Sequence, residues 1–84
     1  SKYCANSIAL SNRGEFRQAV REASKALFLG KASNNTTALA FASRDLAYAY
    51  NLAGDLERAE EWAKQALTYG SQGARDRNII LSAA

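Results

Sequence analysis

The feature that most constrains this chain is an internal repeat with a spacing of 40 residues. The segment Gly14-Glu15-Phe16 reappears in kind as Gly54-Asp55-Leu56. Six of the 17 positions from 14 to 30 are identical at that offset, namely Gly14, Ala19, Ala23, Ala26, Leu27 and Gly30, which recur as Gly54, Ala59, Ala63, Ala66, Leu67 and Gly70. A fixed period of this length is typical of architectures in which each repeat is one supersecondary unit stacked on the next.

The composition indicates that the repeated unit is helical. Alanine, the best helix former, accounts for 18 of the 84 residues. In the repeated segment it recurs at Ala19, Ala23 and Ala26, a spacing that places small side chains along one narrow helical stripe. The sequence therefore predicts an all-α fold in which small side chains let neighbouring helices approach closely.

Glycines and polar residues divide the chain into about five expected helices. Gly14 and Gly54 can adopt the left-handed backbone conformation that ends a helix. The acidic residues Glu15 and Asp55 favour the start of the next helix. We expect helices over about 2–12, 15–30, 37–52, 55–69 and 73–82. The chain is then one domain, residues 1–84, made of repeat one (about 2–36), repeat two (about 37–70), a loop at 70–73 and a C-terminal capping helix (about 73–84).

The residues that are missing exclude several classes of function. The chain has no His, no Pro and one cysteine, Cys4. Imidazole-based catalysis, an intrachain disulfide, a zinc finger and an iron–sulfur site are therefore excluded. We expect a protein that is not an enzyme and that holds no cofactor and no metal. The absence of a signal segment, of an apolar run long enough to span a bilayer and of a second cysteine favours the cytoplasm, with the compartment otherwise open.

The repeated pattern resembles the tetratricopeptide repeat family. The family's hallmark is a large residue, a small one and an aromatic in the first helix, a turn glycine, and spaced alanines in the second helix. Repeat two matches at Leu46, Ala47, Tyr50, Gly54, Asp55, Ala59, Ala63, Ala66 and Leu67, and repeat one at Ser7, Leu10, Gly14, Ala19, Ala23, Ala26 and Leu27. The resemblance covers about residues 2–70, with a spacing longer than usual for the family. It implies an α-solenoid of stacked antiparallel helical hairpins, with the first helix of each repeat lining a concave groove.

The resemblance also implies where a partner would bind. Residues of the two first helices face the groove, and we expect its binding residues to be Ile8, Asn12, Phe41, Arg44, Tyr48 and Asn51, with Cys4, Ser11, Asp45 and Leu52 beside them. Arg can donate two parallel hydrogen bonds to a carboxylate, Asn can bond a peptide backbone, and Tyr adds rigid contact area. The expected function is a non-catalytic scaffold or adaptor that binds a peptide or a partner helix.

Two other interpretations stay open. One is self-association, in which exposed end helices stack into a homo-oligomer; a net charge of +3 over residues 13–31 and −2 over residues 44–64 would favour such contacts. The other is nucleic-acid binding through a basic stripe formed by Arg13, Arg17, Arg21 and Lys25. This second alternative is the less favoured, because Glu15 and Glu22 interrupt the stripe and no aromatic residue lies within it.

Trp62 is expected to make a contact with the capping helix. It lies beside the small-residue stripe of repeat two, and we expect it to pack on Ile79, Ile80 and Leu81 of the capping helix. That contact would close the end of the solenoid, as terminal helices do in repeat proteins.

Overall fold

The computed structural model describes the backbone of residues 2–83 and the side chains of residues 6–75. It consists of α1 (Lys2–Asn12), α2 (Phe16–Ala32), α3 (Thr36–Leu52) and α4 (Leu56–Ala83), and no strand occurs in residues 2–83. The all-α prediction is confirmed. Within this part of the chain, no helix combines the length and the apolar character needed to cross a membrane.

The three turns between helices are copies of one another. Each has its central residue at positive φ: Gly14 at 80°, Asn34 at 54° and Gly54 at 85°. In each, the next residue donates its backbone N–H to a carbonyl five residues back, as Glu15 to Leu10, Asn35 to Gly30 and Asp55 to Tyr50, all at 2.9 Å. This is the Schellman arrangement, which requires a residue that tolerates the left-handed conformation. The role predicted for Gly14 and Gly54 is thus confirmed.

The turns occur at a constant interval, and this interval explains why the predicted loop at 70–73 is wrong. The positive-φ residues lie twenty residues apart (34 − 14 and 54 − 34). The next turn would fall at Ala74, whose Cβ disfavours positive φ. Arg75 would follow it, at the position held elsewhere by the N-terminal flanking residues Glu15, Asn35 and Asp55. With neither turn residue in register, the helix continues through residues 70–73, and no fifth helix is present in residues 2–83.

The continuity of α4 also overturns the packing predicted for Trp62. Residues 79–81 belong to the same helix as Trp62, and 17 residues of helix separate them by about 25 Å along its axis. The two segments therefore do not pack on each other. Trp62 is half-buried and instead lines a hollow with Lys31, at the end of α2, and Tyr69. The side chains of Ile79, Ile80 and Leu81 lie outside the described residues.

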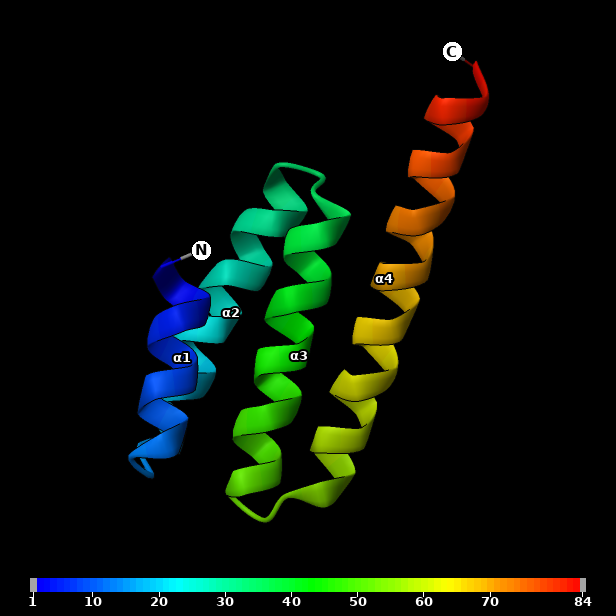
Figure 1. The fold of residues 1–84 in the computed structure, drawn as a ribbon. Coiled ribbons are helices and arrows are strands. Elements are labelled where there is room, and N and C mark those ends of the chain that lie inside the picture. Colours follow the sequence, from blue (N-terminus) through cyan, green and yellow to red (C-terminus); the bar gives the residue numbers. More distant parts are fainter. Residues whose placement is uncertain (1, 84) are drawn as a thin grey trace.

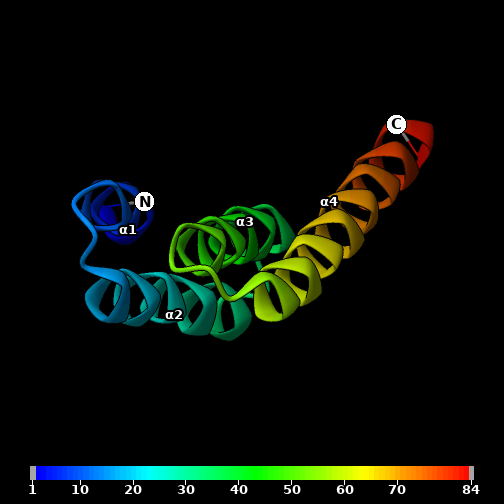
Figure 2. The same ribbon diagram turned by 90° about the horizontal axis from the view of Figure 1, so that it is seen from below.

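The helices form two layers. Helices α1 and α3 lie side by side in one layer, and α2 with the first turns of α4 forms the other (Figure 1, Figure 2). Consecutive helices are antiparallel, and α1 also contacts α3 directly. Asparagine at the N-cap starts α3, because Asn35 Oδ1 accepts the N–H of Ala38 at 3.1 Å.

The core between these layers is built mostly from alanine. The buried apolar side chains are Leu10, Ala19, Ala23, Ala26, Leu39, Ala42, Leu46, Ala49 and Ala59. Because most of them are small, the helix backbones come close enough for side chains to contact backbone. Ser7 of α1, for example, donates its hydroxyl to the carbonyl of Ala19 on α2 at 3.0 Å. A Cβ added to Gly30 of α2 would lie 3.1 Å from Cδ2 of Leu39 on α3.

A substitution pair tests whether the turn register decides the length of α4. We expect Ala74→Gly with Arg75→Asp to create a fourth turn, because it supplies both the left-handed residue and the N-cap that the other turns have. The ¹³Cα chemical shifts at 74 and 75 should then leave the helical range. The control, Ser71→Gly with Gln72→Asp, adds the same residue types three positions out of register and should leave α4 uninterrupted. An uninterrupted α4 in the first variant would contradict the register explanation.

Gly30 and Gly70 hold equivalent positions in the two repeats, but we expect a larger side chain to destabilise the protein only at Gly30. Gly30→Val should lower the free energy of unfolding by about 1–3 kcal/mol, because its methyl groups overpack Leu39. Gly70→Val should change it by only a few tenths of a kcal/mol, because a Cβ at Gly70 meets nothing within 4 Å. Urea unfolding followed by circular dichroism at low protein concentration measures both. Equal effects would mean that the approach of Leu39 to Gly30 is not tight.

Candidate functional site

The candidate site is the exposed side of α3 together with the neighbouring edge of α1. Phe41, Arg44, Tyr48 and Asn51 recur every three or four residues along α3, Leu52 follows Tyr48 by four, and all five are exposed. The opposite side of the same helix carries the buried residues of the core. The helix is therefore amphipathic, but its outward side combines aromatic and aliphatic groups with one cation and one amide. We call this surface the α1–α3 face.

A hydrogen bond joins the two helices across this face. Tyr48 of α3 donates its hydroxyl to Oδ1 of Asn12 at the end of α1, at 2.5 Å. Ile8 lies one turn before Asn12 on α1 and is also exposed. This bond is one of the contacts that link α1 to α3.

A second pair positions the cation of the face. The guanidinium carbon of Arg44 lies 4.9 Å from the centre of the Phe41 ring, which is the geometry of a cation–π contact. Its Nε is 3.9 Å from Oδ1 of Asp45. Arg44 nevertheless remains 61% exposed, so its other N–H groups can bind a ligand. The face thus presents a cation held beside an aromatic ring.

All six predicted groove residues lie at the surface. The structure pairs Asn12 with Tyr48 and Phe41 with Arg44, whereas Ile8 and Asn51 share the face without a contact to the other four that the structure records. Leu52, expected beside them, is exposed as well. The side chain of Cys4 lies outside the described residues.

Two residues expected beside the groove are buried instead. Ser11 is 2% exposed and Asp45 is 1% exposed. Ser11 follows Ser7 by one turn and so shares the side of α1 that faces α2, where Ser7 bonds Ala19. Asp45 precedes the fully buried Ala49 by one turn of α3 and shares its inward side. A resemblance to a repeat family does not distinguish an exposed residue from its neighbour in the sequence, although the two side chains point about 100° apart around the helix.

Sequence reasoning did not find that several polar side chains are buried. Ser7, Ser11, Ser43 and Asp45 are each at most 2% exposed. Small hydroxyl residues substitute for alanine in an alanine-rich interior, so the sequence carries no signal that separates them from exposed serines. The spacing of Ser7 and Ser11 by four residues is the one hint.

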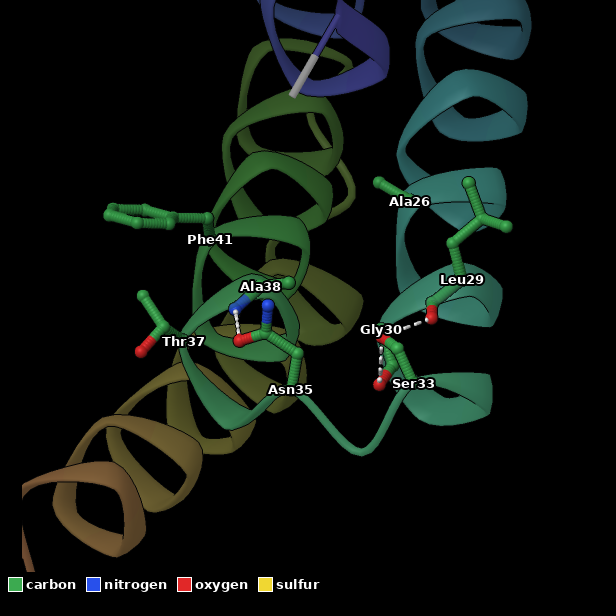
Figure 3. Close-up of a pocket in the computed structure, with 8 residues that line it drawn as sticks. All are labelled: Ala26, Leu29, Gly30, Ser33, Asn35, Thr37, Ala38 and Phe41. Atoms are coloured by element: carbon green, nitrogen blue, oxygen red, sulfur yellow. Dashed lines mark hydrogen bonds between the residues drawn. The ribbon is translucent and has the colours of Figure 1, made fainter. Parts of the chain in front are cut away.

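At one end the α1–α3 face continues into a hollow between α2 and α3. The hollow has a volume of about 300 Å³ and is lined by Ala26, Leu29, Gly30, Ser33, Asn35, Thr37, Ala38 and Phe41. Figure 3 shows Ala26 and Leu29 on the α2 side, and Ser33 and Asn35 where the chain turns. Ser33 donates its hydroxyl to the carbonyl of Leu29 at 2.8 Å, and Asn35 caps α3. The polar groups at the base are therefore used locally, and the remaining wall is mostly apolar.

The basic stripe of the nucleic-acid interpretation is partly neutralised. Arg13 pairs with Glu15 at 3.3 Å, and Lys25 pairs with Glu22 at 3.5 Å. Arg17 and Arg21 are exposed on α2, in the opposite layer from the α1–α3 face. Two of the four cations thus carry a nearby carboxylate, which weakens the potential that would attract phosphates.

Comparison with known proteins adds no relative. The chain matches no protein-family model, no curated protein and no solved structure. In residues 6–75, no three potential metal ligands among His, Cys, Asp and Glu come together. The candidate site is accordingly defined by its own geometry.

The link between α1 and α3 can be measured by a double-mutant cycle. We expect Tyr48→Phe and Asn12→Ala to be coupled by about 0.5–1.5 kcal/mol in the free energy of unfolding, because each removes one partner of the same hydrogen bond. Tyr50→Phe with Asn12→Ala is the matched control, since Tyr50 is on another side of α3, and it should show additivity. Additivity in the first cycle would mean that the Tyr48 bond does not hold α1 in place.

Proposed function

We propose that the chain is a tetratricopeptide-like α-solenoid module that binds a protein segment on the α1–α3 face and catalyses no reaction. The observation that carries the proposal is the exposed combination of Phe41, Arg44, Tyr48 and Asn51 on one side of α3, next to Ile8 and Asn12 of α1. In this proposal α1 and α3 are the first helices of two stacked hairpins. Their place in one layer, backed by α2 and α4, supports it (Figure 2).

The side chains of the face define the chemistry of the ligand. Arg44 offers charge-assisted hydrogen bonds to a carboxylate. Phe41, Tyr48 and Ile8 offer apolar area on either side of it, and the hollow beyond Phe41 can take an aliphatic side chain. Asn51 can donate to and accept from a peptide group. The ligand we propose is a short peptide segment with an acidic residue next to an aliphatic or aromatic one.

The same chemistry separates this proposal from nucleic-acid binding. The face carries one cation, Arg44, among apolar and amide groups, and the cations of α2 lie in the other layer. Binding that relies on one charge pair and apolar contacts has a shallow salt dependence, whereas a complex with several phosphate contacts loses affinity steeply as salt rises.

Selection from a displayed random-peptide library tests the proposal. We expect enrichment of peptides that carry Asp or Glu beside an apolar residue, and loss of their binding by at least about tenfold in the variant Phe41→Ala, Arg44→Ala, Asn51→Ala. Tyr48 is left unchanged because it also joins α3 to α1. Circular dichroism should show unchanged helix content in the variant.

The matched control replaces the same number of exposed residues in the other layer. The variant Arg17→Ala, Gln18→Ala, Arg21→Ala should bind the selected peptides as the wild type does. If no peptide is enriched, or if the control loses binding while the α1–α3 variant keeps it, the proposed function is wrong.

A further inference from the structure

One flank of α4, beside the line that faces α3, carries an apolar stripe that is mostly exposed within residues 6–75. Leu67 is 73% exposed and Leu56 is 66% exposed, and Ala63 and Gly70 are exposed between and beyond them. Together with the half-buried Ala74 they repeat at intervals of three, four and seven residues, which places them on one side of the helix. We call these five residues the α4 stripe. Figure 2 shows α4 at the end of the array, packed against α3.

The internal repeat shows what kind of element covers such a stripe. Forty residues earlier, α2 carries Phe16, Ala23, Leu27 and Gly30 at the equivalent positions. There Ala23 is fully buried and Gly30 lies against Leu39 of α3. The same side of the same type of helix is thus covered by another helix in repeat one and left open in repeat two.

Gly70 gives a separate reason to expect a neighbour. A glycine inside a helix costs about 1 kcal/mol relative to alanine, and at Gly30 that cost is offset by the close approach of Leu39. At Gly70 an added Cβ would meet nothing within 4 Å, so no contact among the side chains that the structure describes accounts for the glycine. A helix backbone approaching from outside would.

The stripe is complementary to itself. If two α4 helices lie antiparallel with a two-fold axis on the stripe side, midway between residues 63 and 67, Leu56 meets Ala74 of the second copy and Ala63 meets its Leu67. Each contact then pairs a large side chain with a small one, and Gly70 meets Glu60, whose carboxylate already pairs with Lys64 at 3.3 Å. Such a two-fold contact uses one surface twice, and so the interface closes on a dimer.

The charges along α4 favour the same orientation. Residues 55–64 carry four acidic and two basic side chains and have a net charge of −2, whereas residues 75–77 carry Arg75, Asp76 and Arg77 and have a net charge of +1. An antiparallel arrangement brings the acidic start of one copy to the basic part of the other, and a parallel one opposes like charges. We therefore propose that a second copy of this chain covers the α4 stripe, forming an antiparallel α4–α4 dimer. The stripe shares no residue with the α1–α3 face, so the dimer is independent of peptide binding.

Sedimentation equilibrium from about 10 µM to about 1 mM tests the dimer, a range that brackets weak association constants. We expect the mass to rise from 9.1 kDa towards twice that value. Leu67→Glu should weaken dimerisation by at least about tenfold, because it places a charge at the centre of the apolar contact. Gln65→Glu adds the same charge on another side of α4 and should leave the dimer intact. A wild-type monomer throughout the range, or equal effects of the two variants, would overturn the proposal.

Cross-linking tests the orientation. In a Cys4→Ser background, the double variant Ala63→Cys with Leu67→Cys should form disulfide-linked dimers under mild oxidation, because residues 63 and 67 of opposite copies come within disulfide reach. The single variant Ala63→Cys should link slowly, because in the antiparallel dimer the two copies of residue 63 do not meet. Only a parallel dimer would bring them together. Equal linking of the single and double variants, or a dimer in which neither links, would overturn the antiparallel register. Circular dichroism of each variant reports folding separately.

Discussion

Close approach between helices is the constraint on which the rest of this structure depends. Among residues 6–75, six of the nine buried apolar side chains are alanine, and the serines at positions 7, 11 and 43 are of similar size. Helices separated by such small groups are held by many short contacts between side chain and backbone, such as the contact of Gly30 with Leu39. This spacing leaves no room inside for large groups. Aromatic and cationic side chains such as Phe41, Arg44 and Tyr48 therefore lie on the outward side of α3, where they make the candidate site.

The turns set how many helices the chain makes, and their effect is all or none. A residue at positive φ reverses the chain at 14, 34 and 54, and at the last two turns Asn35 and Asp55 cap the next helix; neither feature is present at 74 and 75, and α4 runs on. The long α4 is thus a consequence of two residues rather than of its whole sequence. Within residues 6–75 the α4 stripe has no counterpart of α3, which covers the equivalent side of α2, and a second copy is the proposed neighbour.

Much of this fold could be predicted from the sequence, and the errors share one cause. Periodic alanines and the turn glycines Gly14 and Gly54 correctly predicted four helices to within two residues at most boundaries. The error came at Gly70 and Gly73, because glycine marks a helix end when it falls on the turn register and is tolerated inside a helix when it does not. For the site, the pattern identified the exposed side of α3. It did not show that Asp45 is buried while Arg44 is exposed, because tertiary packing decides which side of α3 faces inward.

The alanine core has a consequence for the thermodynamics of unfolding. Heat capacity and denaturant sensitivity both scale with the apolar area exposed when a protein unfolds, and an alanine side chain adds little area. For this chain both quantities should therefore fall below those of a leucine-rich bundle of equal length. A low heat capacity change flattens the dependence of stability on temperature. Because of its alanine core, the free energy of unfolding of this chain should therefore vary less with temperature than that of a leucine-rich bundle.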